Sequence, residues 1–148
     1  MKEFETVIFM EPVAKGRARL AVVAGHAKAY TPKKTVNAEA QVIAQIRNEI
    51  GPHGIMFDAG VPLSLSATFY IARPKSAPKR VTMPTTRPDA DNLGKMLLDA
   101  LNGFAFHDDA QLTSVLFRKR FCLSWQVPRI EFRIKEENDG ETSTSSYH

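Results

Sequence analysis

Four aspartates stand at the two ends of one short amphipathic segment near the middle of the chain. The segment, residues 91–102, has apolar residues at the spacing of a helix. Basic residues lie next to both pairs of acids, Arg87 before the first pair and residues 118–120 after the second. Carboxylates inside a basic surface are what a Mg²⁺-dependent phosphodiesterase needs, because Mg²⁺ takes its oxygen ligands from a few carboxylates, water and the substrate phosphate. The four acids are Asp89, Asp91, Asp108 and Asp109.

Each of these features by itself also has an ordinary structural explanation. An aspartate at the start of a helix is usually a cap, and Asp89 or Asp91 can serve as one. Asp91, Lys95 and Asp99 are spaced by four residues, which places them on one helix face, where such pairs are usually surface ion pairs. Only the combination of four acids, a lysine on the same helix and flanking cations favours a metal-dependent nuclease.

Other acidic or metal-binding motifs fit the segment poorly. An EF-hand loop that starts at Asp89 would need oxygen donors at the positions of Leu93 and Ala100. The sequence contains no glycine-rich phosphate loop of the P-loop type. Zinc is not expected, since the chain has one cysteine and its four histidines are scattered.

The elements that must position these residues mix strands and helices without a regular repeat. Residues 63–71 alternate between apolar and polar side chains, which predicts a strand with one buried face. Within 91–102, a buried stripe is expected from Leu93, Met96, Leu97, Ala100 and Leu101. Strands are also expected at 3–10, 111–122 and 127–135, with a strand pair inside 18–30 that turns at 25–26. This order predicts an α+β fold, a mixed β-sheet with two main helices in a single domain.

The first of those helices is expected over residues 35–50. Thr35 is in a suitable place to cap it, and Gly51 and Pro52 end it. Its apolar residues follow helical spacing, which predicts that they face the core. They are Val36, Ala40, Ile43, Ile46 and Ile50.

The composition is that of one folded domain. Hydrophobic residues make up 43% and charged residues 24% of 148 residues, which excludes a disordered chain or a coiled coil. No apolar run approaches the ~20 residues that span a bilayer, and the first residues do not have a signal-peptide pattern. The single cysteine, Cys122, cannot form an internal disulfide, which suits a reducing, cytoplasmic setting. We expect a domain over 1–135, a polar disordered tail over 136–148 and no membrane partner.

Positive charge is concentrated in the predicted domain. Residues 1–135 contain all 20 Lys and Arg but only 12 of the 16 Asp and Glu, so that their formal charge is +8. A body this basic fits an anionic partner, with nucleic acid as the first candidate. The alternative is that these side chains are simply solvated.

The acidic segment closely resembles the RusA family of Holliday-junction resolvases. The residues that carry the resemblance run from Arg87-Pro88-Asp89-Ala90-Asp91-Asn92-Leu93 through Lys95 and 99–103 (DALNG) to Asp108-Asp109, Gln111 and Lys119. The N-terminal pattern of Pro12, Lys15, Arg17 and Arg19, followed by Tyr30-Thr31-Pro32, is similar to phage-type members. The resemblance covers roughly residues 5–134 and departs from the family in the tail and in the long basic loop 73–86.

The resemblance implies a homodimeric, Mg²⁺-dependent endonuclease that nicks four-way DNA junctions in a bacterial or phage-infected cell, with Mn²⁺ as a substitute for Mg²⁺. Asp89, Asp91 and Asp109 match the family's metal-site aspartates, and Asp108 is a candidate to assist them. Lys95 matches the essential lysine, and Lys119 matches a basic position used in activity or DNA contact. The role of Asp99 stays open between the site and a structural ion pair.

The predicted DNA contacts rest on charge and on position in loops. For each of them, a solvated side chain is the ordinary alternative. Two other functions stay open for the protein: a flap- or branch-directed nuclease with the same site, and a DNA-binding protein without catalytic activity. The candidate contacts are Lys15, Arg17, Arg19, Lys33, Lys34, Lys75, Lys79, Arg80, Arg87 and Lys119.

Overall fold

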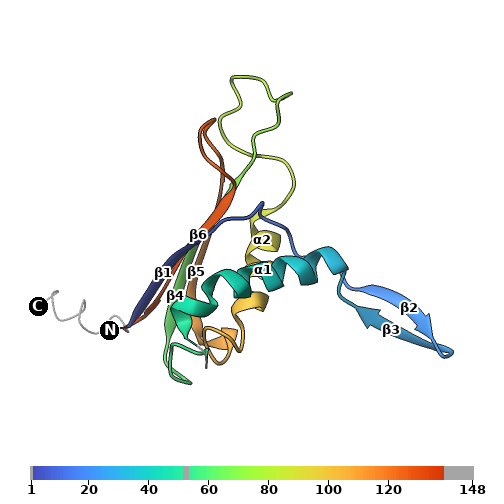
Figure 1. Ribbon diagram of the computed structural model, residues 1–148, viewed down its shortest axis with the longest axis vertical. Coiled ribbons are helices and arrows are strands. Elements are labelled where there is room, and N and C mark those ends of the chain that lie inside the picture. The colour runs from blue at the N-terminus through green and yellow to red at the C-terminus, as the bar shows by residue number, and fades with distance from the viewer. Residues whose placement is uncertain (1, 52–53, 139–148) are drawn as a thin grey trace, which may run out of the picture.

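A four-stranded mixed sheet with two helices on one face forms the body of the protein in the computed structural model, which describes residues 2–51 and 54–138 (Figure 1). The strand order is β1–β6–β4–β5, in which β6 pairs antiparallel with β1 and β4, and β4 pairs parallel with β5. The predicted α+β class is therefore confirmed. The elements are β1 (Glu3–Ile8), β2 (Arg19–Val23), β3 (His26–Tyr30), α1 (Lys33–Ile50), β4 (Leu63–Ile71), α2 (Ala90–Leu101), the 3₁₀ turn η1 (Asp109–Gln111), β5 (Leu112–Phe121) and β6 (Arg129–Glu136).

The chain crosses from β4 to its parallel neighbour β5 through α2. Parallel neighbours cannot be joined by a tight turn, so that the connection must leave the sheet and return over one face. Residues 72–89 form a long loop beyond the end of the sheet, and α2 then packs on β4 and β5 (Figure 1). Asp89 thus lies where the loop becomes helix, and Asp109 lies where the chain turns back into the sheet.

The patterns predicted for β4 and α2 are confirmed. The odd-numbered residues of 63–71 are all buried and the even-numbered ones are half-exposed, as expected for a strand covered on one face. In α2 the whole predicted apolar stripe is buried, together with Gly94. These two faces form the centre of the core with Phe69, Phe106 and Ile130.

Helix α1 differs from its prediction at its start and in its buried face. It begins at Lys33, with Pro32 in the cap position, so that Thr35 is not a cap. Thr35 is instead buried, and Ile46 is the one residue of the predicted stripe that is fully buried; Val36 and Ala40 are exposed. The buried face is Thr35, Ala38, Val42 and Ile46, because the polar Thr35 is held inside by a hydrogen bond from Gly16.

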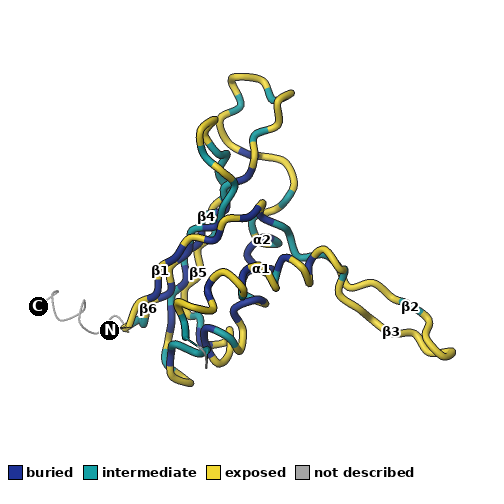
Figure 2. The backbone as a smooth tube through the Cα atoms, in the orientation of Figure 1, coloured by how far each residue is buried: buried dark blue, intermediate teal, exposed yellow. Residues whose placement is uncertain are grey.

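The hairpin β2–β3 stands away from the body (Figure 1) and is exposed along nearly its whole length (Figure 2). Its turn is formed by Ala24 and Gly25, with φ values of 53° and 80°, one residue earlier than expected. Both residues need positive φ because the turn must match the right-handed twist of the strands. The hairpin carries several exposed apolar side chains, among them Leu20 and Val22.

The last described residues belong partly to the sheet. Glu136 ends β6, and the Glu137 carboxylate accepts hydrogen bonds from the hydroxyls of Thr113 and Ser114. The rest of the predicted tail, residues 139–148, lies outside the described residues. Within the described part of the chain, no helix is long and apolar enough to cross a membrane.

Helix α2 lies close to the sheet because Gly94 has no side chain. A Cβ atom built at Gly94 would lie 2.1 Å from the ring of Phe117, on β5. Phe117 also makes an edge-on contact with Phe69 of β4, with ring centroids 6.0 Å apart. The phenyl ring therefore fills the space beneath the helix that a side chain at position 94 would need.

We expect Gly94→Ala to destabilise the fold by about 1–3 kcal/mol, because the overpacked methyl outweighs the helix propensity of alanine, worth about 1 kcal/mol. Urea denaturation measures the change. The double variant Gly94→Ala/Phe117→Leu should recover part of the loss, since leucine vacates the contact. A single variant as stable as the parent would contradict the close seating of α2.

Candidate active site

Two carboxylates stand at the N-terminal end of α2 without serving as caps. Asp89 occupies the cap position with extended backbone (φ −76°, ψ 145°), but its side chain accepts no capping hydrogen bond. Asp91 lies in the first turn, and both residues are exposed. The positive end of the helix dipole favours negative charge here. Both carboxylates can therefore take an external ligand, which the capping interpretation would not allow.

A hollow of about 780 Å³ opens beside this end of the helix. It is lined by three cations around Asp89, so that an anion and a divalent cation could both find partners there. The lining comes from the segment before the hairpin, from the end of the long loop and from α2. It consists of Ala14, Lys15, Arg17, Arg87, Pro88, Asp89 and Asn92.

Lys119 holds the backbone that leads into Asp89. Its ammonium donates to the carbonyl oxygens of Thr86 (2.8 Å) and Pro88 (2.9 Å), reaching from β5 to the end of the long loop. A lysine has three N–H donors, so that one is left for a phosphate. Lys119 was expected to serve activity or DNA contact, and the structure gives it contacts that position the backbone before Asp89.

Asp108 and Asp109 lie in the turn beyond the other end of α2. The Asp108 carboxylate caps η1 by accepting from the Ala110 amide, and the Asp108 amide donates to Oε1 of Gln111. Gln111 is buried and also donates to the carbonyls of Asp58 and Val61. The capping box gives Asp108 a structural role in addition to the one expected of it.

The position of Asp109 is set by the C-terminal end of α2. Its backbone N–H donates to Oδ1 of Asn102, the residue that caps this end of the helix. Partial burial raises the pKa of Asp109, and a hydrogen bond with Asp108 and the negative charges of Asp108 and Asp99 raise the pKa further. A neighbouring cation would stabilise the ionised form of a carboxyl group that lies beside two other acids, because it offsets their repulsion.

The structure therefore separates the predicted metal ligands into two pairs, one at each end of α2. In residues 2–51 and 54–138, no group of three or more His, Cys, Asp or Glu side chains could hold a metal ion. Asp89 and Asp91 fit Mg²⁺ as a pair, since this ion often takes one or two carboxylates and keeps water for the rest. Asp109 does not join them within one chain.

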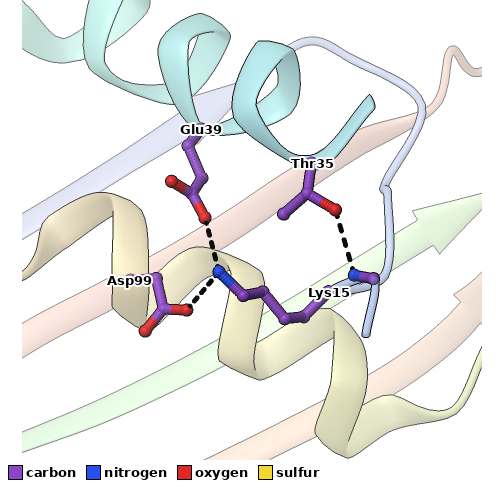
Figure 3. Close-up of polar contacts among 5 residues, drawn as sticks. Lys15, Thr35, Glu39 and Asp99 are labelled. Atoms are coloured by element: carbon purple, nitrogen blue, oxygen red, sulfur yellow. Dashed lines mark hydrogen bonds and ion pairs between the residues drawn. The ribbon is translucent and has the colours of Figure 1, made fainter. Parts of the chain in front are cut away.

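Lys15 joins the two helices. Its ammonium lies 2.8 Å from the Asp99 carboxylate on α2 and 3.2 Å from Glu39 on α1 (Figure 3). Its backbone N–H donates to the carbonyl of Asn92, and the next amide, Gly16, donates to the Thr35 hydroxyl. The Asp99 and Glu39 carboxylates also raise the pKa of Lys15, so that the ammonium stays charged.

These contacts bear on the roles of Asp99, Lys95 and Lys15. Asp99 pairs with Lys15 and not with Lys95, which favours the structural interpretation of Asp99. Lys95 is exposed on the α2 face between Asp91 and Asp99. Two of the three Lys15 donors are engaged, which leaves one for a phosphate in the hollow.

The other predicted DNA contacts lie on three projecting or exposed parts of the chain. Arg17 and Arg19 stand at the base of the hairpin, Lys33 and Lys34 in the first turn of α1, and the rest on the loop of residues 72–89. All of them are exposed. They are Arg17, Arg19, Lys33, Lys34, Lys75, Lys79, Arg80 and Arg87.

Two supporting residues were not assigned a role from sequence. Arg73 donates to the carbonyls of Ala77, Pro78 and Val81 and so gives the long loop its shape. Glu39 is the second partner of Lys15. Arg73 lies two residues after the end of β4, and Glu39 is the single acid in the first half of α1. Their contacts depend on how the elements pack, which spacing along the sequence does not specify.

The comparisons with known proteins identify the family of the chain. Residues 10–135 match the family described as "Endodeoxyribonuclease RusA", which defines the class as a DNA-cleaving enzyme. The chain belongs to the RusA family, and the expected class, a crossover junction endodeoxyribonuclease, is confirmed.

Two relatives match over nearly the whole chain. The chain is 30% identical over 137 residues to the crossover junction endodeoxyribonuclease rusA of Lactococcus phage r1t, with 90% of this chain and 97% of the relative covered. It is 31% identical over 139 residues to the uncharacterized protein YqaN of Bacillus subtilis (strain 168), with 87% and 93% covered.

Replacing Lys15 tests the link between the helices. We expect Lys15→Met to lower the free energy of unfolding by about 1 kcal/mol, since the half-buried carboxylate of Glu39 and the exposed carboxylate of Asp99 lose their partner. The urea midpoint measures this loss. Lys28→Met, on the exposed strand β3, is the control and should change stability by less than about 0.5 kcal/mol. Equal midpoints for the two variants would contradict the link.

Replacing Lys119 separates positioning from DNA contact. We expect Lys119→Met to slow DNA cleavage about tenfold or more, because the backbone before Asp89 loses its two hydrogen bonds. The slope of log affinity against log salt should stay that of the parent. Arg17→Met, which removes a lining cation of the hollow, should instead reduce the slope by about 0.9. A reduced slope for Lys119→Met would make Lys119 a phosphate contact.

Proposed function

We propose that this protein is a structure-selective endodeoxyribonuclease that resolves four-way DNA junctions by Mg²⁺-dependent hydrolysis. The observation that carries the proposal is the hollow at the start of α2, where Lys15, Arg17 and Arg87 surround an uncapped Asp89. Cations there can hold phosphates while the carboxylates take a metal ion. The name of the phage relative, a crossover junction endodeoxyribonuclease, supports branched DNA as the substrate.

The exposed cations are arranged to hold a branched substrate. The hairpin and the long loop project on either side of the N-terminal end of α2 (Figure 1), and both carry predicted contacts. Contacts to backbone phosphates recognise shape more than sequence. We therefore propose that these projections hold two arms of a junction and leave the phosphate at its centre to the hollow.

Four side chains, on α2 and just beyond its two ends, supply the proposed chemistry. Asp89, Asp91 and Asp109 are the proposed metal ligands, and Lys95 is the proposed cation that offsets charge on the phosphate. A bound Mg²⁺ would supply activation of water and neutralisation of negative charge on the leaving oxygen. Mn²⁺ should substitute, since it accepts the same oxygen ligands.

Resolution of a junction needs two nicks in opposing strands. One chain has one site of this kind, and we propose that two chains act together as a homodimer, most simply with two-fold symmetry. The relatives, from Bacillus subtilis and a Lactococcus phage, support a place in the cytoplasm of a bacterial or phage-infected cell.

The decisive experiment compares a labelled four-way junction, a flap and a linear duplex, with Mg²⁺ and with EDTA. We expect paired cuts in the junction with Mg²⁺ alone. Asp109→Asn should abolish cleavage while the affinity for the junction, measured by gel shift in Ca²⁺, is retained, because losing a negative charge does not weaken attraction to phosphate.

Each alternative function has its own outcome in that experiment. A flap cut faster than the junction would identify a flap-directed nuclease. Binding of the junction without cleavage under any divalent cation would identify a DNA-binding protein. An Asp109→Asn variant that cuts at the parental rate would remove Asp109 from the site.

A further inference from the structure

The hairpin β2–β3 has one apolar face and one polar face. Its strands pair in register, with Leu20 opposite Ala29 and Val22 opposite Ala27. Residues opposite each other in an antiparallel pair point to the same side of the ribbon, and neighbours along a strand point to opposite sides. One face therefore consists of Leu20, Val22, Ala27 and Ala29. The opposite face consists of Arg19, Ala21, Val23, His26, Lys28 and Tyr30.

The apolar face is open along its whole length. Leu20 and Val22 are 76% and 78% exposed, and Ala27 and Ala29 are exposed as well. The hairpin stands away from the body (Figure 1), and exposed residues run along both of its strands (Figure 2). No other part of the chain that the structure describes covers this face. Large apolar side chains gathered on one exposed face indicate a surface that binds a partner.

The charges around this face indicate that the partner is DNA. The opposite face carries Arg19, His26 and Lys28, and residues 12–38 contain no Asp or Glu. Arg17, two residues before β2, lines the hollow at the start of α2. DNA offers both kinds of partner, since its phosphates attract cations and the faces of its bases are apolar and stack. The hairpin presents cations and apolar side chains together, next to the proposed cleavage site.

Base faces are accessible in DNA only where the stack of base pairs is interrupted. Neighbouring base pairs of a continuous duplex are about 3.4 Å apart. A β-ribbon with side chains on both faces needs about 10 Å, the spacing at which sheets pack. The hairpin therefore does not fit between the base pairs of an intact duplex. At a four-way branch point, two arms can separate without breaking a base pair, and this separation exposes the end face of each arm.

We propose that the apolar face of β2–β3 stacks on the base pair at the branch point of a DNA junction, while the cations of the opposite face bind phosphates of the neighbouring arm. The tip of the hairpin is narrow, because Ala24 and Gly25 form its turn, and it enters between the two arms. A continuous duplex offers no free base-pair face, so that this contact gives a preference for branched DNA. The proposal rests on the proposed nuclease function and assigns the part of the chain that selects its substrate.

Two double variants of the same strand test the two faces. Leu20→Ser/Val22→Ser makes the apolar face polar, and Ala21→Ser/Val23→Ser is the matched control on the opposite face. Gel shifts in Ca²⁺ measure the affinities for a four-way junction and for a linear duplex. The first variant should bind the junction about tenfold more weakly, because contacts to bases are lost. Its affinity for the duplex, and both affinities of the control, should stay within about twofold of the parent, since no charge is removed.

Fluorescence of 2-aminopurine reports the stacking at the branch point directly. The probe replaces a base beside the branch point in one junction and a base in the middle of an arm in another. Its emission rises when neighbouring bases leave the stack. The parent and the Ala21→Ser/Val23→Ser control should raise the emission at the branch point only, and Leu20→Ser/Val22→Ser should not raise it. No rise with the parent, or an equal rise with both variants, would overturn the proposal.

Stability and association are measured on the same two variants. Both should keep the urea midpoint of the parent, since the hairpin contributes no residue to the hydrophobic core of the described chain. A lower mass by light scattering for Leu20→Ser/Val22→Ser, at the parental affinity for the junction, would assign the apolar face to contact between chains and overturn the proposal. Equal loss of junction affinity in both variants would also overturn it, because the effect would not depend on the face.

Failure of this proposal and failure of the proposed function give different results, because binding is measured without cleavage. A parent protein that binds junctions but cuts no branched DNA overturns the nuclease function, while the comparison of the two variants still decides the role of the hairpin. A parent that cuts junctions, together with a Leu20→Ser/Val22→Ser variant that keeps the parental preference for the junction over the duplex, overturns only the stacking contact.

Discussion

The close seating of α2 on the sheet is the constraint on which the site depends. Gly94 lets the helix approach the ring of Phe117, and that contact fixes the height and the direction of α2 over β4 and β5. Both groups of acids are attached to the ends of this helix. A rigid rod of fixed length therefore sets where the carboxylates stand, and local adjustment of the turns cannot bring them together.

Several cations of this basic protein stabilise its own backbone. Lys15 joins α1 to α2, Lys119 holds the segment before Asp89, and Arg73 organises the long loop. Most N–H donors of these three side chains bind partners in the same chain, which leaves few of them for DNA. The predicted contacts on the hairpin and on the rest of the long loop are exposed side chains. They are therefore better placed to bind phosphate. The positive net charge therefore comes from two groups of cations, one that stabilises the fold and one that is available to bind phosphate.

The two pairs of aspartates also differ in their surroundings. Asp89 and Asp91 are exposed at the positive end of a helix dipole, which attracts negative charge. Asp109 lies beside Asp108 and near Asp99, and desolvation, a hydrogen bond with Asp108 and the charges of both acids raise its pKa.

The local elements and the list of acids could be read from the sequence. Alternation in 63–71 and the helical stripe of 91–102 specify β4 and α2 because short-range periodicity decides which face is buried. The buried face of α1 could not be predicted in the same way, since Thr35 is held inside by Gly16, a residue distant in sequence. Only the tertiary structure decided that Lys15 pairs with Asp99 and that Asp109 lies at the far end of α2 from Asp89. Spacing along the chain determines geometry within an element, whereas the meeting of charges from different elements depends on how those elements pack.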